Sequence, residues 1–240
     1  MKYSLTILLG ISLSVIASAQ STSKFADITG TIGSSQGSIS GSYVHNWKLF
    51  RKKKWEAGLG ARWTSYIGTK VEFITAAPAK HTRSFTAPFL IVFAGQREEN
   101  FDTLTVQRPF TNSVNISVNL GYNFNKKWYG GFNIDLVGFT FGRKGSGILQ
   151  SNGTTTNDPG ARPPAFNLLL TGDHDYGTLN SEFFVKYAIN DRWKVRAVYQ
   201  FLFVEYTTEN VKQQIPEGPL NDRFRNKANN FGAGLSYHFK

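Results

Sequence analysis

Seven charged side chains stand in segments that otherwise alternate between apolar and small polar residues. They are Glu56, Arg62, Asp135, Glu182, Lys186, Lys194 and Arg196. Each falls on the polar side of its segment, among Gly, Ser, Asn and Thr. Because successive side chains of a β-strand point to opposite faces, all seven charges would share one face. Such charges in an enclosed space can form a structural salt-bridge network or line a narrow pore.

Two of these cations are expected to be neighbours. Counting back from the turn at 191–192 brings Lys186 close to Arg196. Like charges side by side in a narrow interior are unfavourable, so they need carboxylates nearby, for which Glu182, Glu56 and Asp135 are available. A plugging network and a pore both remain open. The pore would be lined by Arg62, Asp135, Glu182, Lys186 and Arg196.

Catalytic chemistry has weaker support. The chain has no cysteine, hence no disulfide and no thiolate nucleophile or metal ligand. No strand carries a Ser, His and acid set, although "DHD" at 173–175 could orient His174 or bind a cation weakly. "GRKGSG" at 142–147 lacks the strand–loop–helix context of a phosphate loop. We expect no catalytic residue, metal or cofactor, and a lipid-modifying enzyme is the least favoured alternative.

Eight segments with a two-residue period must position the charges. The last, "NNFGAGLSYHFK", places Phe231, Ala233, Leu235, Tyr237 and Phe239 on one side. The period predicts β-strands. The expected strands are 25–34, 37–47, 55–68, 112–124, 128–142, 179–190, 193–206 and 229–240.

The connections between these strands alternate in length. Short turns at 48–54, 125–127 and 191–192 alternate with long connections at 69–111, 142–178 and 207–229. This is the layout of outer-membrane barrels, with short periplasmic turns and long external loops. The pattern predicts an all-β, transmembrane, antiparallel up-and-down barrel of eight strands. A hairpin of "FLIVF" (89–93) and "TLTVQ" (103–107) would give ten, but "FLIVF" does not alternate.

The bulky faces are expected to point outward. An eight-stranded barrel has an interior only just filled by side chains, so inward Trp, Phe and Tyr on most strands would overfill it. The polar face then lines the lumen and the apolar face meets lipid; the reverse would be a soluble lipocalin-like carrier. Four tryptophans support the first assignment, because an aromatic girdle forms at a membrane interface. They fall at the periplasmic strand ends: Trp47, Trp55, Trp128 and Trp193.

The N-terminal segment has the features of a signal peptide for export. Lys2 precedes an apolar run from Leu5 to Ile16, and Ala17-Ser18-Ala19 has the A-x-A form of a cleavage site. The expected organisation is a signal peptide at 1–19 and one barrel domain at 20–240. The expected location is the outer membrane of a double-membraned bacterium.

With these features, the mature chain resembles the small outer-membrane β-barrel family, of the OmpA-barrel or OmpW-like kind. The resemblance includes the assembly signal strand, marked by Phe231, Leu235, Tyr237 and Phe239, although Lys240 follows the final Phe. It implies outer-membrane lipid and the barrel assembly machinery as partners. It says little of activity, because this fold hosts pores, adhesins, enzymes and anchors.

The net charge of +11 has a local origin. The first two short turns are basic and contain no acid, while the basic and acidic residues of the long loops nearly cancel. The excess is therefore periplasmic and does not indicate nucleic-acid binding. It could contact phospholipid headgroups or an acidic partner, or simply be solvated and fix the depth of the barrel. The residues of these periplasmic basic turns are Arg51, Lys52, Lys53, Lys54, Lys126 and Lys127.

These observations favour a monomeric, non-catalytic outer-membrane barrel with a structural or loop-mediated binding role. The ligand would be extracellular or periplasmic and is not identified by the sequence. The alternative is a narrow channel for ions or small solutes. The apolar stretch "FNLLLTG" (166–172) could pack over the barrel mouth, extend a strand or bind an apolar ligand.

Overall fold

The computed structural model describes residues 21–83, 97–151, 153–170, 175–216 and 218–239. The expected signal peptide, 1–19, and the segment 89–93 lie outside the described residues. Among the residues described, no helix is long and apolar enough to cross a membrane.

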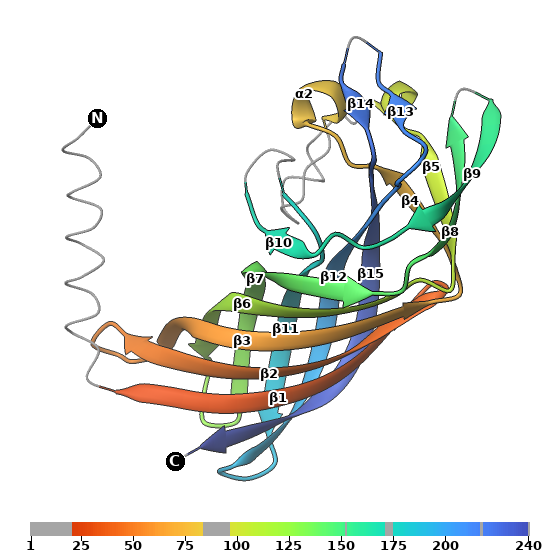
Figure 1. Cartoon of the computed structure of the whole chain (residues 1–240). Coiled ribbons are helices and arrows are strands. Elements are labelled where there is room, and N and C mark those ends of the chain that lie inside the picture. Colours follow the sequence, from red (N-terminus) through yellow and green to blue (C-terminus); the bar gives the residue numbers. More distant parts are fainter. Residues whose placement is uncertain (1–20, 84–96, 152, 171–174, 217, 240) are drawn as a thin grey trace, which may run out of the picture.

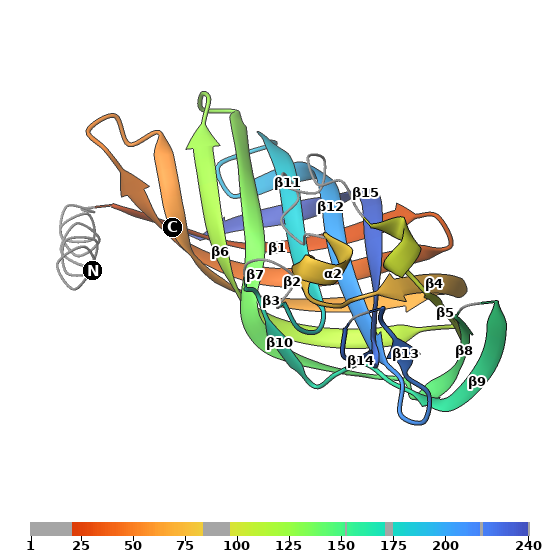
Figure 2. The same cartoon turned by 90° about the horizontal axis from the view of Figure 1, so that it is seen from above.

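Eight long antiparallel strands close into a barrel (Figures 1 and 2). The first and last strands pair with each other, from Lys24 opposite Phe239 to Ile32 opposite Phe231. The terminal strand is thus held on both sides, and the predicted eight-stranded barrel is confirmed. In order around the barrel the strands are β1 (Thr22–Gly33), β2 (Gln36–Leu49), β3 (Trp55–Gly68), β6 (Phe110–Asn123), β7 (Trp128–Gly142), β11 (Leu179–Ala188), β12 (Trp193–Thr207) and β15 (Arg223–Phe239).

The outer wall of the barrel is apolar. Many aliphatic side chains on its strands are 41–73% exposed, whereas the polar residues between them are buried in the interior. An apolar exterior suits a hydrocarbon environment, and closure pairs the backbone groups of the barrel strands. The exposed aliphatic residues include Ile28, Ile32, Leu59, Val114, Ile116, Val195 and Leu235.

One β-bulge interrupts the alternation on β7. Ile116 pairs with Val137, but the next residue, Ser117, pairs with Asp135, so Leu136 is the extra residue. Beyond the bulge Phe139 and Phe141 point outward, at 66% and 60% exposure. The bulge keeps Asp135 and the later Thr140 on the same, inward face, which an unbroken two-residue period would not do.

Above the barrel, four further strands form an external sheet. Its order is β15-β4-β5-β8-β9, and Figure 1 shows it rising from one end of the barrel. Three barrel strands are almost continuous with strands of this sheet: β3 with β4, β6 with β5, and β7 with β8. The bounds are β4 (Lys70–Thr75), β5 (Thr103–Gln107), β8 (Gly145–Ser151) and β9 (Thr154–Ala161).

The predicted external loops are therefore partly wrong. The segments 69–111 and 142–178 contain strands, and β15 begins at Arg223, six residues before the expected start. "TLTVQ" is strand β5, but it pairs with β4 and β8 outside the barrel, so the alternative of ten barrel strands is wrong. The small remaining elements are α2 (Ala79–Thr82), η2 (Glu98–Asn100), β10 (Phe166–Leu168), β13 (Gln213–Gln214) and β14 (Leu220–Asn221).

The external sheet encloses its own hydrophobic core with the upper parts of β3, β12 and β15. Leu202, Val204 and Tyr206 continue the inward face of β12 into this core, which therefore lies over the barrel mouth. Burying each large side chain contributes about 1.5–3 kcal/mol before entropy is counted. We call this set the external core: Tyr66, Val71, Phe73, Leu104, Val106, Leu149, Ala161, Leu202, Val204, Tyr206, Phe224 and Ala228.

Three side chains assigned to the lipid-facing side are buried. Leu179, Phe201 and Phe203 form a cluster against which Leu169 packs. Leu169 follows β10, which pairs with β7 from Phe166 opposite Phe139. Residues 166–169 of "FNLLLTG" thus both extend the sheet and cover an apolar patch above the membrane part of the wall.

Candidate functional site

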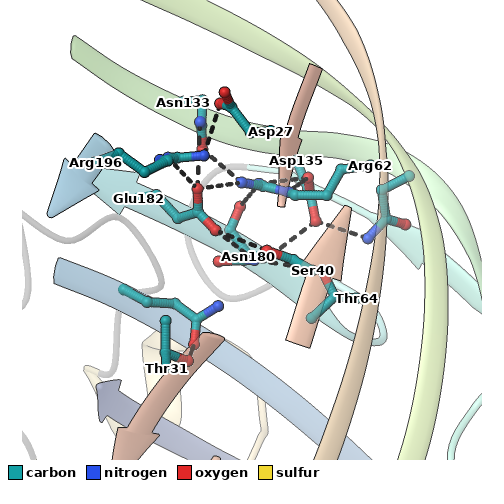
Figure 3. A network of polar contacts seen from close by, with 12 residues as sticks. Asp27, Thr31, Ser40, Arg62, Thr64, Asn133, Asp135, Asn180, Glu182 and Arg196 are labelled. Carbon is teal, nitrogen blue, oxygen red and sulfur yellow. Dashed lines mark hydrogen bonds and ion pairs between the residues drawn. The ribbon is translucent and has the colours of Figure 1, made fainter. Parts of the chain in front are cut away.

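The lumen contains a compact group of charges from opposite walls of the barrel (Figure 3). Arg62 on β3 donates to Asp135 on β7 through Nε at 2.9 Å and Nη2 at 2.6 Å. The Nη1 of Arg62 donates to Asn133 at 2.5 Å and lies 3.4 Å from Glu182. Arg62 is therefore anchored to two neighbouring strands across the interior.

Arg196 on β12 continues the group toward the periplasmic end. It donates to Glu182 at 2.9 Å and to Asp27 at 2.7 Å. Lys186 donates to both oxygens of Asp27, at 2.9 and 3.0 Å. Lys186 and Arg196 are indeed register partners, as predicted from the turn.

The group is electrically balanced and nearly inaccessible to solvent. Three cations face three carboxylates, and each side chain is at most 2% exposed. Burying charges is costly unless they are paired and hydrogen-bonded, and here both conditions hold. The six residues of this lumen charge network are Asp27, Arg62, Asp135, Glu182, Lys186 and Arg196.

Neutral amides complete the network. Asn115 donates to Asp135 at 2.8 Å, and the backbone N–H of Asn180 donates to the same carboxylate at 3.0 Å. Asn180 Nδ2 donates to Glu182 at 3.2 Å, and the guanidinium of Arg62 donates to the carbonyl of Asn180. Each charged side chain has fixed hydrogen-bonding partners, which favours a rigid plug, and only the Nε of Arg196 is buried without a partner among the charged atoms of the described network.

Asp27 is the network residue that the sequence reasoning missed. It accepts from both Lys186 and Arg196 and so separates the two cations. The signal was present in "FADITGTIGS", where Phe25, Asp27 and Thr29 share one face of the strand. That face is buried, whereas Ile28 is 60% exposed.

Two predicted lumen charges lie outside the network. Glu56 accepts from Ser23 at 2.6 Å, Asn123 at 2.9 Å and Asn46 at 3.1 Å. Lys194 is half-buried, 5.5 Å from the ring centre of Tyr129. Neither side chain forms an ion pair with another described residue, because both lie nearer the periplasmic rim than the lumen charge network does.

Aromatic rings fill the periplasmic end of the lumen, contrary to the expectation that bulky residues point outward. Phe25, Tyr129 and Phe184 are at most 3% exposed. The Nζ of Lys186 lies 3.4, 5.7 and 5.1 Å from their respective ring centres. Glycines opposite these rings make the room: a Cβ at Gly121 would lie 1.8 Å from the Tyr129 hydroxyl.

A neutral polar zone lies between the charges and the external core. The Oε1 of Gln200 accepts from Thr31 at 2.7 Å, Ser38 at 3.0 Å and Asn230 at 2.9 Å. Gln200 Nε2 and Asn230 Oδ1 have no partner among the described residues. Unpaired buried polar atoms favour ordered water in this zone.

One serine has neighbours that can activate a nucleophile. Ser236 Oγ lies 3.0 Å from Lys186 Nζ and 3.3 Å from His238 Nε2. Ser236 is fully buried, however, and Lys186 is engaged by Asp27. A substrate carbonyl would have no access, so this arrangement is a packing contact. In "DHD", residues 173 and 174 lie outside the described residues.

The predicted aromatic girdle is built from cross-strand pairs. Trp55, Trp128 and Trp193 are 43–45% exposed. Each contacts a tyrosine of the next strand, with ring centres 4.9, 4.9 and 5.0 Å apart. The fourth member, Trp47, stacks on His45 at 5.1 Å. The tyrosines are Tyr122, Tyr187 and Tyr237.

The periplasmic basic turns lie beside this girdle. All six of their predicted residues, Arg51 to Lys54, Lys126 and Lys127, are exposed. Lys54 Nζ lies 5.9 Å from the Tyr122 ring centre, and Lys127 Nζ lies 6.0 Å from that of Tyr187. In the assembly signal strand, Phe231, Leu235 and Phe239 are 43–67% exposed on the outer wall, with Tyr237 half-buried beside them.

The external sheet has polar anchors of its own. Glu205, fully buried, accepts from Arg223 and Arg225, each at 2.8 Å. Asp158 accepts the backbone N–H groups of Glu209, Asn210 and Val211 at 2.7–3.1 Å. Burial alone would raise the pKa of Asp158, but the N–H donors of Asn210, Gly160 and Val211 outweigh it and lower the pKa below its usual range.

Within the described part of the chain, no three His, Asp or Glu side chains are grouped so that they could hold a metal ion.

The closed barrel, the apolar outer wall and the aromatic girdle define an integral outer-membrane β-barrel protein. The chain belongs to the outer membrane protein beta-barrel domain family, whose model matches residues 5–239. This family implies the bacterial outer membrane as the location. No curated protein shows significant sequence similarity to the chain.

Solved structures with a similar fold are distant in sequence. Ail, the attachment invasion locus protein of Yersinia pestis, is 9% identical, with 91% of this chain and 96% of Ail covered and a TM-score of 0.34. Neisserial surface protein A is 9% identical over 91% and 96% of the two chains, with a TM-score of 0.30. A major outer membrane protein from Thermus thermophilus is 10% identical over 90% and 99%, with a TM-score of 0.37.

Proposed function

We propose that the mature chain, exported through its signal peptide, is a monomeric, non-catalytic outer-membrane barrel with a structural or loop-mediated binding role. Its external sheet is the binding platform and its barrel is the membrane anchor. Its constant partners are outer-membrane lipid and, during biogenesis, the barrel assembly machinery.

The observation that carries this proposal is the filled interior. The external core covers the outer end, the lumen charge network occupies the middle, and Phe25, Tyr129 and Phe184 occupy the periplasmic end. Each layer joins opposite walls of the barrel. A solute would have to break buried ion pairs and displace packed rings, so transport through the lumen is disfavoured.

The external sheet supports a binding role because it is rigid. Its strands are paired with one another and with β15, and its core contains twelve buried residues. Binding residues commonly lie on segments that a rigid scaffold positions. Exposed parts of this scaffold include the edge strand β9, where residues 154–157 point their side chains into solvent.

A narrow channel is the second candidate. The neutral polar zone around Gln200 and Asn230 supports it, since unpaired polar atoms there favour water inside the barrel.

Liposome swelling separates the two functions. Mature protein would be inserted into liposomes loaded with impermeant polymer and then exposed to glycine, arabinose or glucose. The proposed role predicts swelling no faster than in empty liposomes for all three solutes. Size-dependent swelling would reject it in favour of the channel.

A further inference from the structure

Three neighbouring strands bend at the same level of the barrel wall, and each bend carries a cation. Strand β3 passes into β4 at Lys70, β5 into β6 at Arg108, and β7 into β8 at Arg143. The bends are hydrogen-bonded to one another: Arg108 N–H donates to Thr69 O at 2.6 Å and Arg143 N–H to Phe110 O at 2.8 Å. The side chain of Arg143 also donates to the carbonyl of Arg108 at 3.1 Å.

These bends are fixed from inside the molecule. The hydroxyl of the buried Tyr206 accepts from the N–H of Phe110 at 3.2 Å and donates to the carbonyl of Arg143 at 3.3 Å. Arg108 has a left-handed backbone, with φ of 48°, at the bend between β5 and β6. The backbone at the three bends is therefore held in a defined position, and Arg143 is also fixed through its side chain.

The cations line a groove of about 700 Å³ on the outer wall. Its remaining lining is largely apolar, with Ile67, Pro109 and Phe110 among its residues. No acidic residue lines it among those described, and Lys70, Arg108 and Arg143 form no ion pair with any described side chain. Glu72 lies on the same side of β4 as Lys70, and the two residues line a neighbouring groove together, but no ion pair joins them. We call this the cationic groove.

An apolar groove adjoins it. This second groove has a volume of about 460 Å³ and shares Ile67, Gly68 and Thr69 with the cationic groove. Ile32, Ile39 and Ile67 line it and are 73%, 52% and 57% exposed on the outer wall. Exposed aliphatic side chains therefore extend from the cationic groove into the apolar groove beside it.

The position of the cationic groove matches the outer boundary of the membrane. Trp55 marks the periplasmic girdle at one end of β3, and Ile67 lies at the other end. With about 3.3 Å of strand per residue and a strand tilt of about 40°, the distance along the membrane normal from Trp55 to Ile67 is about 30 Å. This is the thickness of the hydrocarbon layer of a membrane. The cations then stand at headgroup depth, with the apolar groove beside the acyl chains.

We propose that the cationic groove binds a phosphate-bearing lipid of the outer leaflet. Lys70, Arg108 and Arg143 hold the phosphate, and an acyl chain follows Ile67 into the adjoining groove. Guanidinium and ammonium groups are the usual protein donors to phosphate, and no carboxylate lines the cationic groove among the described residues. The proposal does not depend on whether the barrel conducts.

Native mass spectrometry of the refolded mature protein in neutral maltoside micelles tests this proposal. The probe is bis-phosphorylated lipid A, titrated against the wild type and a triple variant, Lys70→Gln, Arg108→Asn and Arg143→Gln. Asn is chosen at 108 because it tolerates the left-handed backbone. The matched control removes three cations from the periplasmic turn: Lys52→Gln, Lys53→Gln and Lys54→Gln.

The wild type should saturate with one lipid per barrel. Losing charged hydrogen bonds should weaken binding in the triple variant by at least about tenfold, while the control stays within about twofold. Lipid A stripped of its phosphates should bind the wild type as weakly as intact lipid A binds the triple variant. Inorganic phosphate at tenfold excess should not displace the lipid, because it lacks the acyl chain.

Equal binding by the triple variant and the wild type would overturn the proposal, as would an equal loss in the control or full binding of dephosphorylated lipid. Displacement by inorganic phosphate would also reject a lipid site. The boiled and unboiled gel mobilities report whether each variant is folded. If the triple variant does not fold, Arg143→Gln alone decides, with an expected loss of about threefold or more.

Discussion

Lys186 and Asp27 lie 2.9 Å apart inside the barrel, although they are separated by 159 positions in the chain. Both side chains are at most 2% exposed, and Arg196 shares the same carboxylate. The pair joins β11 to the first strand, which also pairs with the last one. The contact can form only when the barrel is closed, so it reports directly on closure.

Replacing Lys186 by Met should destabilise the barrel. The substitution leaves the lumen charge network with one uncompensated buried carboxylate, which costs about 3–5 kcal/mol in comparable pairs. The free energy of unfolding would be measured in detergent by urea titration, followed by tryptophan fluorescence. The control is the double variant Lys186→Met with Asp27→Asn, which restores neutrality and should recover at least half of the loss. No recovery would mean that the loss arises from packing alone.

Truncating the external core should loosen the platform and leave the barrel closed. Phe73 is fully buried in that core, and Phe73→Ala should cost about 3–5 kcal/mol locally. Hydrogen exchange should quicken in β4, β5 and β8 but not in β1 or β2. Ile148→Ala, at a 36% exposed position of the same sheet, is the matched control and should change little. Equal quickening throughout the barrel would contradict a separately packed external core.

Acid should release the segment that Asp158 holds. Its folded pKa is lowered, so this carboxylate contributes stability above its unfolded pKa of about 3.9 and loses that contribution as pH falls through the folded value. Amide exchange of residues 209–211, corrected for intrinsic rates, should therefore rise below pH 4. Asp158→Ala should produce the same rise at pH 7. A variant that kept full protection at pH 7 would show that the carboxylate is not the anchor.

The Trp–Tyr pairs should stabilise the periplasmic rim. Trp128→Ala removes one pair and should cost about 1–2 kcal/mol, since an aromatic pair contributes about 0.5–1.5 kcal/mol beyond its buried area. Tyr187→Ala should cost a similar amount, and the double variant should cost less than the sum. Strict additivity in the unfolding free energies would argue against a coupled pair.

The membrane barrel was predictable because apolar and polar residues alternate in its strands over ten residues or more. The segment 112–124 shows this, and the position of Lys186 beside Arg196 followed from counting back from one turn. Asp27 was not predicted as a lumen charge. The strand that carries it alternates in the same way, but its apolar face is weak. The external sheet was not predicted for another reason: β4 and β5 are short, β4 pairs with the distant β15, and β5 pairs with β4 rather than with a barrel strand.

Inward aromatic rings could not be predicted from alternation. The room for Tyr129 is made by Gly121 on the neighbouring strand, a compensation visible only once the register is known. The β7 bulge is similar, since Leu136 shifts the phase of the strand although neither the bulged residue nor its two chain neighbours is Gly or Pro. Pairwise three-dimensional relationships of this kind are not encoded in a single-strand pattern.

Single-channel recording shows whether the lumen of the barrel is closed to ions. Purified mature protein would be inserted into a planar lipid bilayer in 1 M KCl, with insertion verified by protease-resistant, heat-modifiable protein recovered from matching liposomes. A plugged lumen should give a quiet baseline at both polarities for the wild-type protein. Steady, ion-selective current steps from the wild type would contradict a plugged barrel and establish the channel.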